Sequence, residues 1–153
     1  MRALIQRVRR SDVRIGDATI GAIDAGMTVL LGVGDRDGAE EGRLLARKIA
    51  NLRVFEDDDG KINRSILEAG GAILLISQFT LYADCRKGRR PSFAHAAQPG
   101  IAEPLVSAVA DALRAEGIHV ETGRFGAEMI VTIVNDGPLT IWLDTDDLRS
   151  TGG

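Results

Sequence analysis

The chain has 153 residues, of which 44% are hydrophobic and 27% are charged, a composition typical of a soluble globular protein with one hydrophobic core. Its net charge of −3 excludes the strong basic field of a non-specific nucleic-acid binder, so any contact with RNA must be local. Cys85 is the one cysteine, and no apolar run is long enough to span a membrane. We therefore expect a single domain over residues 1–153, located in the cytoplasm and without membrane contact.

The first third of the sequence predicts strands. Short aliphatic and β-branched segments at 3–8, 13–15 and 18–23 are separated by the hairpin signal Gly16-Asp17. The nearly unbroken apolar run 27–33 favours a strand buried on both faces, although a buried helix segment has the same pattern.

A helix is expected next, over residues 39–51. Asp37 and Glu40 have the spacing of a capping box, and Leu45, Ile49 and Leu52 repeat at helical intervals. The following segment predicts a strand at 53–56, a turn at 57–60, a long apolar strand from 72 to 77 running on toward 82, and a loop at 84–91.

The last third predicts a second helix followed by strands. Pro99 suits the entry of a helix over 100–116, which has one apolar face and a glycine cap at Gly117. Strands are then expected at 119–122, 129–134 and 139–143, the last two joined by the turn 135–138. The fold class is therefore α+β: one domain, mostly antiparallel sheet or partial barrel, with two main helices.

Several familiar binding signals fail on inspection. The segment 57–60 resembles the middle of a calcium loop, but the first and last ligand positions, Phe55 and Ile66, have no carboxylate. The glycines within 32–38 do not fit a dinucleotide loop, because the third falls one residue late and two aspartates would repel a pyrophosphate. With two histidines and one cysteine the chain has no structural zinc ligand set, so no metal and no cofactor is expected.

The sequence does not identify a nucleophilic side chain with an activating base beside it. Cys85 adjoins two basic residues that could favour a thiolate, but an incidental thiol beside a charged loop is the simpler interpretation. His95 could act as a base for Ser77, Ser92 or Cys85, yet a surface histidine ahead of the second helix is favoured.

Three short segments stand out from ordinary packing. The run Arg86-Lys-Gly-Arg-Arg90 holds four positive charges in an otherwise mildly acidic chain, although charge runs are more often solvated loops than phosphate sites. Ser77-Gln-Phe-Thr80 brings polar side chains to the end of an apolar strand, and Asn135-Asp-Gly-Pro-Leu-Thr140 carries a Gly-Pro bond in a turn. Each segment alone is a weak signal.

Together the two motifs resemble the signatures of the D-aminoacyl-tRNA deacylase family, whose members hydrolyse the ester between a D-amino acid and the 3′ end of tRNA. Further segments look like that family in the same order, so the resemblance covers the chain end to end. These segments are Met1-Arg-Ala-Leu-Ile-Gln-Arg-Val8, Asn51-Leu-Arg-Val-Phe-Glu56, Leu81-Tyr-Ala-Asp84, Arg86-Lys-Gly-Arg-Arg-Pro-Ser-Phe93 and Glu121-Thr-Gly-Arg-Phe-Gly126.

The resemblance implies a homodimer with active sites at the subunit interface, where Ser77, Gln78, Phe79 and Thr80 face a Gly-Pro loop of the partner. The bond before Pro138 is cis in the family, and its neighbouring carbonyls would accept from the substrate's α-ammonium group. The list of residues expected for substrate binding and chiral selection is Gly137, Pro138, Asn135, Thr140 and Arg7, with Arg7 holding the loop from behind. An L side chain would strike this loop, whereas a D side chain or glycine would pass.

The implied chemistry depends on the backbone and on the substrate. N–H groups near Phe79 and Thr80 would stabilise the oxyanion, and the 2′-hydroxyl of the terminal adenosine would help to activate water. Thr80 as a covalent nucleophile is the competing hypothesis, although the sequence offers no evident base for it. Contacts with tRNA phosphates are expected from Arg86, Lys87, Arg89 and Arg90.

Two other functional classes stay open from sequence. A tRNA-binding module without turnover is consistent with the basic run alone. A small-molecule esterase or peptidase for D-amino acids would leave that run without a role.

Overall fold

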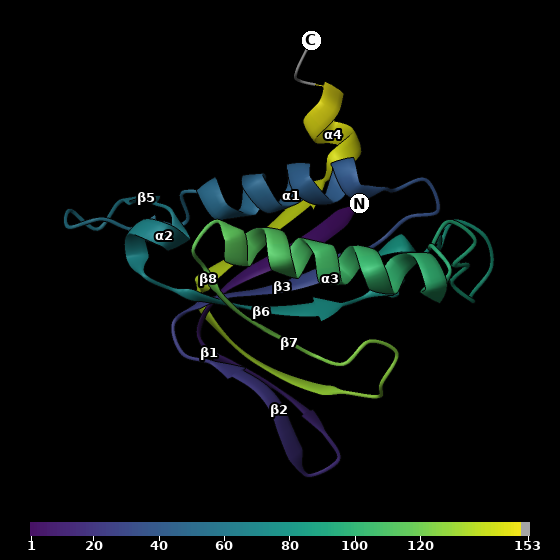
Figure 1. Ribbon diagram of the computed structural model, residues 1–153, viewed down its shortest axis with the longest axis horizontal. Helices are drawn as coiled ribbons and strands as arrows, with labels where there is room; N and C mark the ends of the chain where they lie inside the picture. Colours follow the sequence, from purple (N-terminus) through teal and green to yellow (C-terminus); the bar gives the residue numbers. More distant parts are fainter. Residues whose placement is uncertain (151–153) are drawn as a thin grey trace.

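The computed structural model describes residues 1–150 (Figure 1). The strands are β1 (Arg2–Ile15), β2 (Ala18–Ile23), β3 (Gly26–Gly32), β4 (Phe55–Glu56), β5 (Ile62–Arg64), β6 (Ala72–Ser77), β7 (His119–Thr122) and β8 (Ile130–Asp144). The helices are α1 (Ala39–Asn51), α2 (Ile66–Ala69), α3 (Pro99–Ala115) and α4 (Thr145–Ser150), with a 3-10 turn, η1 (Phe79–Tyr82). The expected α+β class is confirmed.

The main sheet is mixed, with the order β2-β1-β3-β6-β7 and with β8 on the other side of β1. The pairs of β1 with β2, β3 and β8 are antiparallel, whereas β3, β6 and β7 run parallel. Most of the strand pairs are thus antiparallel, as expected, and the sheet is mixed because β3, β6 and β7 are parallel to one another. Each parallel pair is joined by a crossover that contains α1 or α3, the connection that parallel strands require.

The sheet curls into a nearly closed barrel at one end. The second half of β1 pairs with both β2 and the first half of β8, and this layer bends away from the helices (Figure 1). Gly21 on β2 approaches β7 so closely that a Cβ would lie 2.9 Å from the carbonyl oxygen of Thr122. A small apolar cluster fills the curl, and its buried members are Val8, Val13, Ile23, Leu74 and Ile76. The partial barrel is confirmed.

The two long helices lie side by side on one face of the sheet (Figure 1). They touch at Gly42 of α1, where a Cβ would stand 3.2 Å from Val109 of α3. Alternate residues of the central strands point into the core beneath them, including Ile5, Val29 and Leu75, all of which are buried. This core holds the sheet as a platform, and it leaves the opposite face partly open.

Several predicted boundaries are corrected. The strands expected at 3–8 and 13–15 form one strand, β1, and those expected at 129–134 and 139–143 form β8. The apolar strand stops at Ser77, because the chain turns into η1 instead of running on to Tyr82. The strand expected at 53–56 begins only at Phe55.

Helix caps differ from the expectation in two places. Gly38, not Asp37, caps α1: its N–H donates to the Glu41 carboxylate at 2.7 Å. Asp37 is instead engaged by the buried ammonium group of Met1, at 2.7 Å. The short helix α2 was not expected, although Ser65 and Glu68 form a full capping box at its start.

Candidate active site

The polar segment 77–80 leaves the sheet at the end of β6 and is held in a fixed turn. The Gln78 N–H donates to the Leu31 carbonyl at 2.7 Å, which keeps the chain attached to β3 as it turns into η1. The turn then closes on itself, because the Ala83 N–H donates to the Thr80 carbonyl at 3.0 Å. The segment is therefore a rigid exit from the sheet.

Two backbone N–H groups in this turn are unpaired. Within residues 1–150, the N–H groups of Phe79 and Thr80 have no hydrogen-bond acceptor. The hydroxyl of Thr80 accepts a hydrogen bond from the side-chain amide of Gln78. No carboxylate or imidazole in the described part of the chain bonds to that hydroxyl. The turn thus offers two free donors and no evident base.

An apolar cavity of about 360 Å³ opens beside the turn. The side chains of Phe79 and Phe93 meet edge to face at its rim, with ring centroids 5.0 Å apart. Both rings are exposed, Phe79 by 57% and Phe93 by 37%. The other lining residues include Leu31, Val33, Ala102, Val106, Phe125 and Ser77. An exposed aromatic rim around an apolar cavity suits a flat, partly apolar ligand group.

The Gly-Pro segment forms a large bulge in β8. Gln6 pairs with Thr140 and Val8 pairs with Asn135, so Arg7 alone stands opposite residues 136–139. Side chains close both ends of the bulge. Asn135 donates to the Arg7 carbonyl at 2.9 Å, and Gln6 donates to the Thr140 hydroxyl at 3.1 Å.

Within the bulge, the peptide bond between Gly137 and Pro138 is cis, as expected, and Gly137 has a φ of 119°. Arg7 lies beneath and is 7% exposed. Its Nη1 donates to the Val54 carbonyl at 2.7 Å, and its Nε lies 3.6 Å from the Asp136 carboxylate. Arg7 is therefore placed behind the loop.

The two motifs do not meet within one chain. On β3, Met27 is the partner of Arg7, whereas Leu31 is the partner of Ser77. Residues 27 and 31 are four positions apart, which corresponds to about 13 Å along a strand. The two motifs are therefore separated along the sheet within one chain.

The basic loop is closed at its base and partly neutralised. Asp84 and Ser92 exchange two backbone hydrogen bonds, at 2.7 and 2.9 Å. The guanidinium of Arg86 donates two hydrogen bonds to the Asp84 carboxylate, at 2.9 and 2.7 Å. These bonds hold the pKa of that carboxyl well below its usual range. In the described residues Lys87, Arg89 and Arg90 have no ion-pair partner. Three of the four expected cations are thus available for phosphate.

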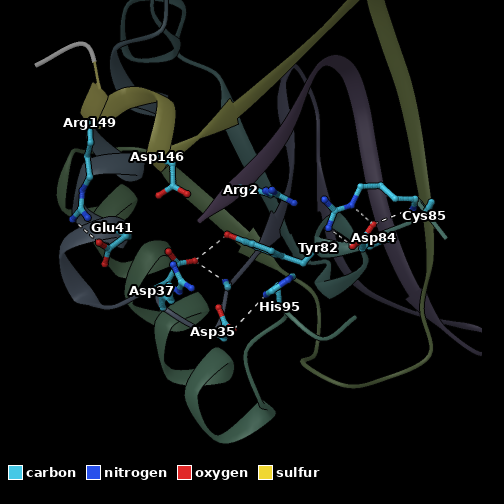
Figure 2. Close-up of a pocket in the computed structure, with 14 residues that line it drawn as sticks. Arg2, Asp35, Asp37, Glu41, Tyr82, Asp84, Cys85, His95, Asp146 and Arg149 are labelled. Atoms are coloured by element: carbon cyan, nitrogen blue, oxygen red, sulfur yellow. Dashed lines mark hydrogen bonds and ion pairs between the residues drawn. The ribbon is translucent and has the colours of Figure 1, made fainter. Parts of the chain in front are cut away.

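A second cavity, of about 710 Å³, lies behind η1 and is lined by charged side chains (Figure 2). Tyr82 points across it and donates to Asp37 at 3.2 Å. Burial, with the nearby Asp37 and Asp144 carboxylates, raises the pKa of Tyr82 well above its ordinary value. His95 lies 3.7 Å from Asp35 and is solvent-exposed, as expected for a surface histidine.

Sequence reasoning missed Arg2, which borders this cavity and contacts η1. An arginine that starts a strand carries no signal of such a contact. Cys85 is exposed. Within residues 1–150 no three His, Cys, Asp or Glu side chains gather as a metal site would require.

Over residues 4–144 the sequence matches the profile of a family described as D-Tyr-tRNA(Tyr) deacylase. The chain belongs to this family. A D-aminoacyl-tRNA deacylase of Thermus aquaticus is 56% identical over 147 residues, covering 96% of this chain and 97% of that protein. A D-aminoacyl-tRNA deacylase of Roseiflexus sp. (strain RS-1) is 57% identical over 149 residues, covering 97% and 96%.

The fold is also shared with a solved structure. The structure of a c-Myc DNA Unwinding Element Binding Protein aligns with a TM-score of 0.88 and 41% identity, covering 94% of this chain and 98% of that one. The two chains therefore share the arrangement of their elements in space. None of the helices in residues 1–150 is both long and apolar enough to cross a membrane.

Proposed function

We propose that the protein hydrolyses the ester bond of D-aminoacyl-tRNA, and of tRNA mischarged with glycine, releasing the amino acid and tRNA. The observation that carries this proposal is the pair of unpaired N–H groups on Phe79 and Thr80 beside an apolar cavity. Ester hydrolysis passes through a tetrahedral oxyanion, and two fixed backbone donors are the usual way to stabilise it. Membership of the deacylase family supports the same reaction.

The attacking water is activated by the substrate. With no carboxylate or imidazole bonded to Thr80 in the described residues, the enzyme lacks a general base in the turn. The 2′-hydroxyl of the terminal adenosine lies next to the ester and serves in its place. Thr80 as a nucleophile is disfavoured, because its hydroxyl oxygen accepts a hydrogen bond from an amide rather than giving its proton to a base.

The apolar cavity takes the base of that adenosine. Single-stranded RNA ends are recognised mainly by stacking on aromatic rings, and Phe79 and Phe93 offer exposed rings at the cavity rim. With the base in this cavity, the ester would lie near the free N–H groups of the turn.

The active form is a homodimer in which the partner supplies the Gly137-Pro138 loop. The separation of the two motifs within one chain supports this arrangement. So does an apolar row across the open sheet face, where Trp142, Leu4 and Leu30 are cross-strand neighbours and Trp142 is 46% exposed. The outer edge of β8 has no strand partner in residues 1–150.

The selection of D over L substrates follows from steric exclusion at that loop. Carbonyls of the Gly137-Pro138 segment hold the α-ammonium group while the ester is held at the turn. With both ends fixed, a D side chain points to solvent and an L side chain collides with the backbone of the loop. Glycine has no side chain and passes. The phosphates of the acceptor end meet the basic loop, through Lys87, Arg89 and Arg90.

The test is deacylation of matched D-Tyr-tRNA, L-Tyr-tRNA and Gly-tRNA. We expect hydrolysis of the D and glycyl esters, and no hydrolysis of the L ester above the spontaneous rate. A tRNA-binding module would leave all three intact. A small-molecule esterase would cleave D-tyrosine methyl ester as fast as D-Tyr-tRNA and would tolerate charge reversal of Arg89 and Arg90.

Subunit mixing tests the shared site. Gly137→Ala and Gln78→Ala each damage one half of the site. In a randomly mixed population half of the dimers are heterodimers, and one of their two sites is intact, so about a quarter of wild-type activity returns. Absence of recovery, with heterodimers shown by mass spectrometry, contradicts the cross-subunit arrangement.

A further inference from the structure

Arg2 makes four contacts that together connect η1 to the sheet. Its Nη1 donates to the Leu81 carbonyl at 3.0 Å, and its Nε donates to the Asp144 carboxylate at 2.9 Å. Its guanidinium carbon lies 4.4 Å from the ring centre of Tyr82 and 5.7 Å from that of Trp142. Figure 2 shows Arg2 alongside the Tyr82 ring.

These contacts fix the C-terminal end of the η1 turn, at Leu81. The start of the turn is tied to β3 through Gln78 and Leu31. Next to Arg2 in the ladder, Gly32 lets η1 lie flat on the strand, since a Cβ there would be 3.0 Å from the Gln78 carbonyl oxygen and 3.1 Å from the Leu81 Cβ. Arg2 then covers the far end.

The direction of the two free N–H groups depends on both anchors. Because the turn has only four residues, a rotation of the peptide planes of Phe79 and Thr80 is coupled through the backbone to the Leu81 carbonyl. That carbonyl is held by a cation whose planar fork is also fixed by Asp144. A rotation of the turn therefore breaks a charge-assisted hydrogen bond.

We propose that Arg2 is a positioning residue for the reaction, which keeps the N–H groups of Phe79 and Thr80 aimed at the oxyanion. This inference rests on the proposed function. Arg2 acts through the Leu81 carbonyl and touches no substrate. Because donors in an oxyanion hole act on the transition state, the loss of Arg2 lowers kcat and leaves KM and the preference for D over L unchanged.

The experiment compares Arg2→Met and Arg2→Lys with the wild-type enzyme on D-Tyr-tRNA. For Arg2→Met we expect kcat to fall about ten- to a hundredfold, the range for one charge-assisted hydrogen bond, with KM within about twofold. Arg2→Lys keeps a donor for the Leu81 carbonyl and recovers part of kcat. Arg149→Met is the matched control, because Arg149 borders the same cavity and pairs with Glu41 at 2.5 Å without touching η1.

Hydrogen exchange of the peptide covering residues 78–83 gives a readout independent of activity. We expect faster exchange there in Arg2→Met and wild-type exchange in Arg149→Met. Wild-type kcat in Arg2→Met overturns the inference, as does an equal fall in both variants at equal loss of thermal stability. If the wild-type enzyme fails to hydrolyse D-Tyr-tRNA, the proposed function fails, and unchanged exchange in Arg2→Met separately refutes the role of Arg2.

Discussion

The Nη2 atom of Arg7 lies 2.9 Å from the position that a Cβ atom on Gly137 would occupy. The backbone of the Gly-Pro loop thus rests directly on a buried guanidinium. Because Arg7 is itself held by the Val54 carbonyl, the loop has a support that extends to the segment after α1.

Gly137→Ala is expected to displace the loop and to lower kcat/KM for D-Tyr-tRNA at least about tenfold. A φ of 119° costs an L residue about 1–3 kcal/mol, and the added methyl group strikes Arg7. Gly60→Ala is the control. Gly60 also has a positive φ, 74°, but no atom within 4 Å of an added Cβ, so its variant loses stability and keeps activity. Full activity in Gly137→Ala contradicts this account.

Arg7→Met is expected to lower the free energy of unfolding by about 1–3 kcal/mol, because it leaves the Val54 carbonyl without its partner. Arg9→Met is the matched control. Both arginines approach the Asp136 carboxylate, at 3.6 and 3.5 Å, but the Arg9 side chain is 78% exposed and that of Arg7 only 8%. The exposed pair contributes less than about 1 kcal/mol. Urea denaturation measures both, and equal effects would show that burial does not matter here.

Thr80→Val is expected to keep at least about a tenth of the wild-type kcat, since it loses one hydrogen bond with Gln78 worth about 1 kcal/mol. Removal of a true nucleophile would reduce kcat by about 10⁴-fold or more. Single-turnover deacylation separates these outcomes. A D-aminoacyl-tRNA ending in 2′-deoxyadenosine should be cleaved far more slowly by both proteins, and its cleavage at full rate removes the RNA-assisted mechanism.

Charge reversal in the basic loop is expected to raise KM with little change in kcat. Arg89→Glu or Arg90→Glu removes a free cation, which should reduce the slope of log KM against log salt by about 1. Arg86→Ala should raise KM less, because the Arg86 guanidinium is already paired with the Asp84 carboxylate. Titration of KM with potassium chloride checks the order. An effect of Arg86→Ala larger than that of either reversal contradicts the assignment.

Acid should weaken the fold partly through Glu68. The Ser65 N–H donates to the Glu68 carboxylate at 2.6 Å, and this hydrogen bond, together with the Ser65 side chain, lowers the pKa of that carboxyl below the ordinary value of 4.5. A lowered folded-state pKa means that the stabilisation is complete above 4.5 and is lost as the pH falls through the folded-state value. Glu68→Gln should therefore be less stable than wild type at neutral pH and approach it in acid. A stability gap that stays constant with pH would rule this out.

Much of the fold was predictable because local patterns dictate it. The capping-box spacing at 37 and 40 and the apolar repeat at 45, 49 and 52 together predicted a helix over 39–51, and α1 has these bounds. Strand direction was not predictable in the same way, since whether β3 and β6 run parallel depends on crossovers rather than on side-chain alternation. The capping box of Ser65 and Glu68 was present in the sequence and could have revealed α2.

The motifs of the candidate site could be found in the sequence, but the contacts that hold these motifs in place could not. The motifs that contain Gln78, Thr80 and Asn135 were recognisable in the sequence, and the role of these residues in an active site stays a prediction. The pairing of Arg86 with Asp84 has a sequence signal, two opposite charges two positions apart in a loop. The contact between Arg2 and Leu81 joins residues 79 positions apart and has none. Such long-range contacts depend on how the turn packs on the sheet.

The paired backbone hydrogen bonds between Asp84 and Ser92 have an evolutionary consequence. They close the base of the loop between Asp84 and Ser92, so amino-acid changes or insertions at the tip of the loop should leave the backbone of the neighbouring turn, η1, in place. If the loop binds tRNA and the turn holds the oxyanion, as proposed, recognition of the nucleic acid can diverge between lineages while the hydrolytic apparatus stays the same. In that arrangement the molecule separates the part that meets a variable partner from the part that breaks the bond.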